Sequence, residues 1–301
     1  MRPTVSSLSA GAAQGERGKC RVIGVVNVTP DSFSDGGRFA TVDKAVAHGL
    51  RLRDEGADLV DVGGESTRPG AARVTVEEEL SRVVPVVREL AGAGVTVSVD
   101  TMRAAVAESA LEAGASLVND VSGGLADPEM ARVVAALGVP YVVMHWRGHS
   151  KDMQRRAVYG DVVSDVVAEL SARLDALTSA GVQSEQIIVD PGIGFAKTAA
   201  HNWCLLAGLE RLHALGRPLL VGASRKAFLG ELLAGPHGPR PSQGREAATV
   251  AVTTYAALHG AWGVRVHSVA ANADAVRAAA AIGAAARVER ADLIANAGIA
   301  P

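Results

Sequence analysis

The chain has 301 residues and a formal net charge of −2, with 48% hydrophobic residues, 21% charged residues and 33 glycines. This composition indicates a globular α/β protein with many tight turns and excludes a disordered chain. Because the charge is nearly balanced and Lys and Arg form no runs, we expect no binding to nucleic acid or to an anionic membrane, and any anionic substrate must be held by local cations.

Short apolar runs alternate with stretches of helical spacing, and eight such pairs follow one another. The runs are nearly continuously apolar, as expected of strands buried on both faces. We expect strands over residues 21–28, 59–64, 96–100, 117–121, 140–145, 186–190, 218–222 and 263–267. We expect helices over residues 43–55, 76–91, 103–113, 128–137, 161–179, 199–215, 245–258 and 274–282. Left-handed C-terminal caps are expected at Gly56, Gly94, Gly114, Gly138, Gly181 and Gly216.

Eight βα units in about 250 residues predict a single (β/α)8 TIM barrel over residues 21–290, with a doubly wound open sheet as the alternative. Residues 1–20 and 291–301 are expected to be tails. In such barrels the loops after the strands build the active site.

The cysteines and the N-terminus bear on the location of the protein. Cys20 and Cys204 have no metal-binding or disulfide spacing, and two unpaired thiols fit a reducing compartment. Neither a signal peptide nor an apolar stretch of about 18 residues is present. These features predict a cytoplasmic protein without a membrane span.

Polar groups of two kinds follow the predicted strands. Asp100, Asn119 and Asp190 offer carboxylate and amide groups that can bind the edge of a flat heterocycle with several N–H donors, such as an aminopyrimidinone. A structural contact to a loop N–H is the alternative for any one of them, but three at three strand ends favour a ligand. Asp61 and Asp120, which lie close to these positions, are expected to be structural.

The second kind of group is cationic. Arg and Lys beside glycine-rich turns suit a phosphate or pyrophosphate, and Arg265 and His267 share one face of their strand. The set consists of Arg68, Lys226, Arg265 and His267, with Thr67 and Ser224 nearby. Asn27, with oxygens of the loop after it, could hold a divalent ion such as Mg²⁺.

No pairing of a nucleophile with a base is visible in the sequence, because GxSxG, HExxH and a Cys with a partner His are all missing. The expected chemistry is therefore stabilisation of a departing pyrophosphate by cations, without a covalent enzyme intermediate.

The motifs together resemble the bacterial dihydropteroate synthase family over residues 21–290. They are, in the family's order, NVTPDSFSDGG, GGESTRPG, SVDT, NDVSG, DPGIGF, GASRK and VRVH. The resemblance implies a (β/α)8 barrel and a homodimer. It also implies that 6-hydroxymethyl-7,8-dihydropterin pyrophosphate and 4-aminobenzoate are joined to 7,8-dihydropteroate, in an SN1-like substitution that releases pyrophosphate.

The same resemblance implies roles for individual residues. The pterin would be held by Asp100, Asn119, Met144, Asp190, Lys226 and Arg265. Pyrophosphate would bind to Asn27, Arg68, Arg265 and His267, and Mg²⁺ to Asn27. The 4-aminobenzoate site would be framed by Phe33, Thr67, Pro69, Phe195 and Ser224. The catalytic set would be Asn27, Asp35, Arg68, Lys226, Arg265 and His267, with Asp35 facing the cationic carbon.

The chain departs from the family pattern at two positions. Ser268 stands where an acidic residue is common, which should change local hydrogen bonding and leave the reaction unchanged. Ala196 stands where Gly is frequent, a minor change. No residue is added after Phe195, so the aminobenzoate pocket is expected to have a sulfonamide-sensitive shape.

Two other functions remain as alternatives at this point. One is the related pterin-binding domain of corrinoid methyltransferases, against which SFSDGG, STRPG and GASRK argue. The other is a non-catalytic pterin-binding paralogue, against which Asn27, Asp35, Arg68 and His267 argue, because a binder would not need these groups.

Overall fold

The computed structural model describes residues 20–29, 38–66, 73–149 and 153–296. Its strands are β1 (Arg21–Asn27), β2 (Leu59–Gly63), β3 (Val97–Asp100), β4 (Leu117–Asp120), β5 (Tyr141–Met144), β6 (Ile187–Asp190), β7 (Leu220–Val221) and β8 (Gly263–Val266). They form one parallel sheet in the order β6-β5-β4-β3-β2-β1-β8-β7. A parallel bridge between Val189 and Leu219 joins the two ends of that order. The sheet is therefore a closed barrel, which confirms the predicted fold and excludes the open sheet.

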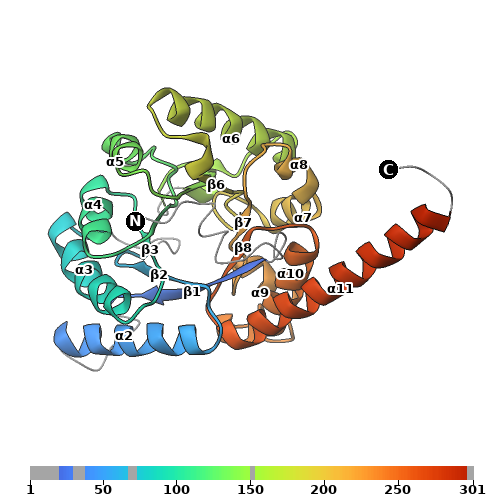
Figure 1. Ribbon diagram of the computed structural model, residues 1–301, viewed down its shortest axis with the longest axis horizontal. Helices are drawn as coiled ribbons and strands as arrows, with labels where there is room; N and C mark the ends of the chain where they lie inside the picture. The colour runs from blue at the N-terminus through green and yellow to red at the C-terminus, as the bar shows by residue number, and fades with distance from the viewer. Residues whose placement is uncertain (1–19, 30–37, 67–72, 150–152, 297–301) are drawn as a thin grey trace.

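Helices surround the barrel (Figure 1). They are α2 (Arg38–Asp54), α3 (Val76–Gly92), α4 (Ala104–Glu112), α5 (Glu129–Leu137), α6 (Val162–Ser179), α7 (Ala199–Ala207), α8 (Leu209–His213), α9 (Ala227–Leu232), α10 (Glu246–Leu258) and α11 (Val269–Asn296). Short 3-10 helices cover Met153–Arg156, Ser184–Gln186 and Ser242–Arg245. All six glycines predicted as caps have positive φ, between 64° and 114°. The predicted helix ends are thus confirmed by the backbone.

The helices differ from the prediction in several places, and the first of these is α2, which begins at Arg38 and not at Asp43. The stretch 199–215 is two helices, because the chain breaks at Gly208, a poor helix former. A side chain at position 208 would come within 3.0 Å of Val163 on α6. Glycine at this position therefore lets α6 pack closely against the junction of α7 and α8. Helix α9 was not predicted, and α11 is much longer than 274–282. The Ala-rich sequence of α11 favours helix, and the helix continues past the barrel in Figure 1.

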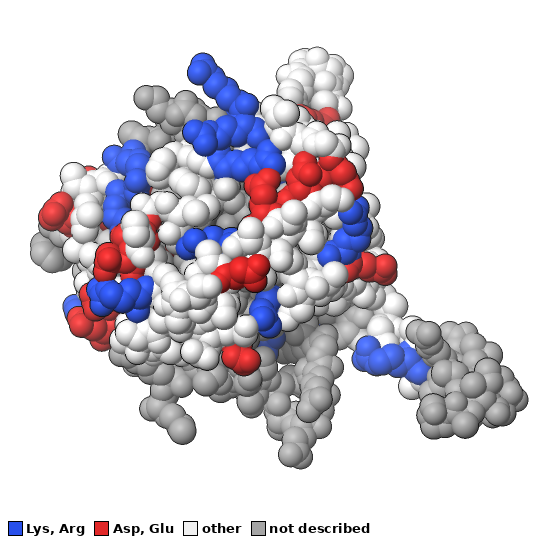
Figure 2. Space-filling view, turned by 90° about the horizontal axis from the view of Figure 1, so that it is seen from above, with Lys and Arg blue, Asp and Glu red and all other residues white. Residues whose placement is uncertain are grey.

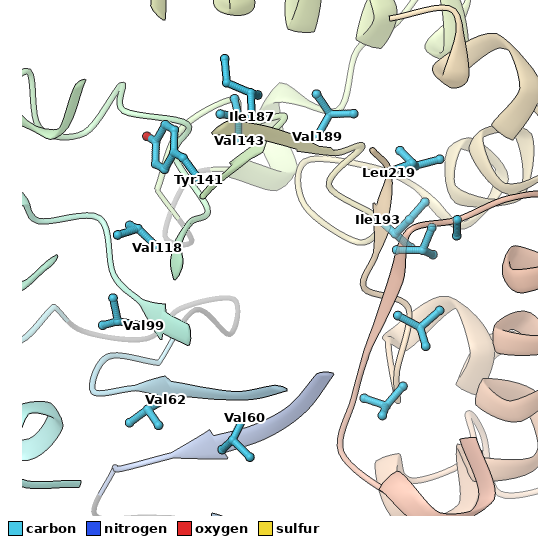
Figure 3. Packing of buried hydrophobic residues seen from close by; sticks show 14 of the residues in the cluster. Val60, Val62, Val99, Val118, Tyr141, Val143, Ile187, Val189, Ile193 and Leu219 are labelled. Atoms are coloured by element: carbon cyan, nitrogen blue, oxygen red, sulfur yellow. The ribbon is translucent and has the colours of Figure 1, made fainter. Parts of the chain in front are cut away.

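Side chains alternate between the two faces of each strand, and this separates two apolar layers. The outward-facing layer packs under the helices and includes Val60, Val62, Val99, Val118, Val143 and Val189 (Figure 3). The inward-facing layer fills the barrel and consists of Ile23, Leu59, Leu117, Val142, Ile188, Leu220 and Trp262. The inward-facing positions that follow this inner layer along the strands carry the polar side chains described below.

The loop after β4 is anchored by Asp120, which is fully buried. One oxygen accepts hydrogen bonds from the N–H and the hydroxyl of Ser122, at 2.7 and 2.6 Å. The other accepts from the Gly124 N–H at 2.7 Å and from the Tyr141 hydroxyl at 2.8 Å. All four donors are groups of the protein itself, so both oxygens of Asp120 are occupied by structural hydrogen bonds, as the sequence analysis predicted.

The surface and the cysteines agree with the sequence analysis. On the face shown in Figure 2, both signs of charge are present, with a group of Lys and Arg near the top of the view next to a group of Asp and Glu. Cys20 is buried and Cys204 is exposed, and both are free thiols. In the described part of the chain, no helix has both the length and the apolar character needed to cross a membrane.

The Tyr141 hydroxyl gives a test of the loop anchor. Tyr141→Phe removes one donor to Asp120 and leaves a buried carboxylate less well satisfied, so the free energy of unfolding should fall by about 1 to 2 kcal/mol. Urea denaturation measures this value, with Tyr255→Phe on the surface of α10 as the matched control. Equal stability of the two variants would mean that the bond contributes nothing.

Candidate active site

The strand register places the predicted polar residues side by side. Asp100 on β3 is the register partner of Asn119 on β4, and Met144 on β5 is the partner of Asp190 on β6. Asn119, Met144 and Asp190 each come two residues after a member of the inner apolar layer, so they face into the barrel. We call this end of the barrel, where the strands finish, the barrel mouth.

Arg265 on β8 links three strands of the barrel mouth. Its Nε donates to Asp61 Oδ2 on β2 at 2.6 Å, and its Nη2 donates to Asp100 Oδ2 at 2.7 Å. The same Asp61 oxygen accepts from Asn119 Nδ2 at 2.9 Å. Asp61, for which the sequence suggested only a structural role, therefore orients two candidate binding residues.

The inward direction of Asp61 could have been predicted from the sequence, although its pairing with Arg265 could not. Asp61 lies two residues after Leu59, which belongs to the inner apolar layer, so its side chain also faces into the barrel. Its other oxygen, Oδ1, is buried and has no hydrogen-bond partner in the described structure. The carboxylate is therefore available to a further donor inside the barrel mouth.

Burial perturbs the acids of the barrel mouth. Burial raises the pKa of Asp100 to about 7; the Arg265 cation opposes this shift, and the nearby Asp61 carboxylate adds to it. Burial also raises the pKa of Asp190, although the Gly192 N–H donates to Asp190 Oδ1 at 2.7 Å and Lys226 lies nearby. Such shifts are common where buried acids bind ligands.

Lys226 faces this group from the loop after β7. Burial lowers the pKa of Lys226 to about 8, against the attraction of Asp190. Its Nζ lies 4.0 Å from the centre of the Phe195 ring, a cation–π contact. A side chain at Gly194 would come within 2.9 Å of Lys226 Cδ, so glycine there lets the lysine lie against the loop. The structure thus brings Lys226, Phe195 and Asp190 together, as predicted.

Ser224 and His267 form a pair at the ends of β7 and β8. The Ser224 hydroxyl lies 3.0 Å from His267 Nδ1 and accepts from the His267 backbone N–H at 3.2 Å. The nearby Ser268 differs from the family pattern, and its carbonyl accepts from Asn272 at 2.7 Å. Ser224 therefore joins His267 to the loop after β7, which also carries Lys226.

Asn27 ends β1, where it is the register partner of Gly63. In the described residues no three His, Cys, Asp or Glu side chains are grouped to bind a metal ion. The predicted residues Phe33, Asp35, Thr67, Arg68 and Pro69 lie outside the described residues.

The described geometry is suited to a flat, polar ring that carries an anionic group. Inward-facing acceptors from β2, β3, β4 and β6 can bind ring N–H donors, while Lys226 and Arg265 supply cations at one side and His267 follows Arg265 on the same face of β8. The site rests on strand ends, which hold side chains more rigidly than loops do.

Comparisons with known proteins agree with this geometry. A family model described as pterin binding enzyme matches residues 23–267. The dihydropteroate synthase of Mycobacterium leprae is 58% identical over 259 residues, which cover 85% of this chain and 91% of that protein. The solved dihydropteroate synthase of Xanthomonas albilineans with 4-aminobenzoic acid has a TM-score of 0.81 at 48% identity, covering 88% of this chain and 93% of the other. The structure of the Xanthomonas albilineans enzyme in complex with 7,8-dihydropteroate has a TM-score of 0.78 at 45% identity, and the match covers 88% of this chain and 94% of the other.

The raised pKa of Asp100 predicts a pH effect on stability. Its ordinary value is 3.8 and its folded value about 7, so between these values the folded chain binds a proton that the unfolded chain has lost. The stabilisation from Asp100 is complete below about pH 4 and is lost as the pH rises toward 7. Relative to Asp100→Asn, the wild type should lose on the order of 1 to 3 kcal/mol over this range.

Urea denaturation of both proteins at several values between pH 4.5 and about 7.5 checks this prediction. The variant serves as the control for all other titrating groups. Parallel stability curves would contradict the assignment of the shifted titration to Asp100.

Proposed function

The chain belongs to the dihydropteroate synthase family of pterin binding enzymes, which are transferases of folate biosynthesis, and we propose how its residues perform the reaction. The substrates are 6-hydroxymethyl-7,8-dihydropterin pyrophosphate and 4-aminobenzoate, and the products are 7,8-dihydropteroate and pyrophosphate. The observation that carries the proposal is the group of inward-facing acceptors at the barrel mouth, with Arg265 held among them.

In this proposal the pterin binds through its N–H donors. Asp100, Asn119 and Asp190 accept or donate hydrogen bonds along the ring edge, and Met144, which is 4% exposed, provides an apolar wall. Arg265 already donates to Asp100, so a pterin that takes over this acceptor frees one side of the guanidinium to stack on the ring. A ring without these donors would leave buried polar groups unpaired, which gives specificity.

We propose that pyrophosphate is held by Arg265 and His267, together with Arg68 in the second loop. Asn27 would bind Mg²⁺, which suits a position with a single amide because Mg²⁺ keeps several waters and shares the phosphate oxygens. When bound, the ion supplies positive charge against the charge that develops on pyrophosphate. The residues of this chain bind and orient the leaving group.

The chemical step needs no nucleophile from the protein. The C–O bond to pyrophosphate breaks with both electrons on oxygen, and Asp35 would face the cationic methylene carbon that results. The amine of 4-aminobenzoate forms the new C–N bond and loses a proton. Because this amine is already neutral near pH 7, it needs no strong base.

The second substrate is proposed to lie against Phe195 and Ser224, with Phe33, Thr67 and Pro69 from the first two loops. A sulfonamide resembles 4-aminobenzoate in shape, so we propose that it competes for the same site. We also propose a cytoplasmic homodimer, on the basis of the family and the two free thiols.

The function is tested by pyrophosphate release from the dihydropterin substrate with Mg²⁺, with and without 4-aminobenzoate, while dihydropteroate is detected. Release that depends on 4-aminobenzoate and matches product formation is expected. Saturable pterin binding without release would instead indicate a non-catalytic paralogue, and methyl transfer to a corrinoid would indicate the other alternative.

Lys226→Met tests the cationic side of the pterin site. The substitution keeps the length of the side chain and removes its donors, so the dissociation constant for the dihydropterin pyrophosphate should rise by about 10- to 100-fold. Calorimetry measures the binding, with Lys44→Met on the exposed face of α2 as the matched control. Equal affinity of the two variants for the dihydropterin pyrophosphate would contradict a role for Lys226 in binding it.

A further inference from the structure

Three titratable side chains, two of them buried, form a hydrogen-bonded series between α6 and the loop that follows β6. His145 Nε2 lies 3.0 Å from Glu169 Oε2, and His145 Nδ1 lies 3.0 Å from Lys197 Nζ. His145 is 2% exposed and Lys197 is 4% exposed. Glu169 forms the outer end on α6, where it also pairs with Arg147. None of the roles proposed above uses these three side chains, which we call the Lys197–His145–Glu169 chain.

The protons of the chain can be placed from its donors. An ionised Glu169 carboxylate can only accept, so the imidazole carries its proton on Nε2 and donates it to Glu169, and Nδ1 accepts from Lys197 Nζ. The electrostatics agree: burial, and then the Lys197 and Arg147 cations, lower the pKa of His145 to about 4. The hydrogen bond from His145 lowers the pKa of Glu169 to about 2, with a further contribution from Arg147. The imidazole is therefore a neutral connector between the Glu169 carboxylate and Lys197, and burial lowers the pKa of Lys197 to about 7.

Lys197 uses a second donor to hold its own loop. Its Nζ donates to the Phe195 carbonyl at 3.0 Å. Ala196, between the two, has φ +49°, a left-handed conformation that costs an alanine energy and that suits the glycine common in the family. The Tyr159 hydroxyl donates to the Ala196 carbonyl at 3.0 Å. Hydrogen bonds from Lys197 and Tyr159 thus stabilise a turn that alanine alone disfavours.

The loop has no room to relax at its start. Gly192 has φ +68°, and a side chain there would come within 2.5 Å of the His145 carbonyl and 3.3 Å of Lys197 Nζ. The His145 backbone N–H donates to the Asp190 carbonyl at 2.8 Å. The loop is therefore tied to the end of β5 at both Asp190 and Lys197, and the segment between these ties carries Phe195.

We propose that Lys197 is a positioning residue that fixes Phe195 at the 4-aminobenzoate subsite through the Lys197–His145–Glu169 chain, and so sets the affinity for the second substrate. This inference rests on the proposed function, in which Phe195 frames that subsite. The pterin groups Asp100 and Asn119 are held by strand register instead, so their positions do not depend on Lys197.

Lys197→Met tests the inference, because methionine fills the same space without donating. The KM for 4-aminobenzoate should rise about tenfold, while kcat and the dissociation constant of the dihydropterin pyrophosphate change less than about threefold. Lys44→Met is the matched control and should behave as the wild type. A fall in kcat with unchanged KM for 4-aminobenzoate would overturn the proposal, and absence of product from the wild type would overturn the proposed function instead.

Tyr159→Phe is the second variant and decides the question if Lys197→Met fails to fold. It removes only the hydroxyl that holds the Ala196 carbonyl and keeps the ring on which Arg147 lies, 3.8 Å from the ring centre. The KM for 4-aminobenzoate should rise about threefold. An unchanged KM would contradict the positioning role of the turn.

Nitrogen NMR of the His145 ring gives a readout that does not depend on activity, with the signals assigned by comparison with His145→Gln. Near pH 7 the wild type should show a protonated Nε2 and an unprotonated Nδ1. In Lys197→Met the loss of the neighbouring cation should raise the pKa of His145. A proton on Nδ1 in the wild type would contradict the chain of donors.

Discussion

The closed parallel register of the barrel is the constraint on which the site depends. Closure between β1 and β8 brings Arg265, near the end of the last strand, against Asp61 and Asp100, which lie 204 and 165 positions earlier in the chain. The register also fixes Asp100 beside Asn119. Because these side chains continue the inward-facing alternation of their strands, the fold that buries the core also delivers the polar groups to the barrel mouth.

The charges of the barrel mouth depend on one another. Asp61, Asp100 and Asp190 are buried acids, and without Arg265 and Lys226 they would carry a large desolvation cost. With these cations they form a polar site that a pterin can enter by exchanging one set of hydrogen bonds for another. The same balance explains why the pKa of Asp100 is raised while that of Lys226 is lowered: burial disfavours the charged form of both.

The strands and the barrel could be predicted from the sequence, as could the position of the described candidate residues at strand ends and in the loops after them, because apolar runs, glycine caps and period-two alternation are local signals. It did not predict the break at Gly208, which depends on packing against Val163, nor the length of α11. The role of Asp61 depends on a partner 204 residues away, and the role of Lys197 on His145 from another strand end. Pairings of this kind are fixed by tertiary structure, so no local pattern in the sequence predicts them.

A crystal structure with the dihydropterin pyrophosphate bound would test the central claim most directly, namely that the register-fixed groups of the barrel mouth bind the pterin. The account predicts that the ring edge contacts Asp100, Asn119 and Asp190, that Lys226 lies beside the ring, and that Arg265 stacks on it while still bonded to Asp61. A pterin bound outside the barrel mouth, with Arg265 still bonded to Asp100, would contradict the account.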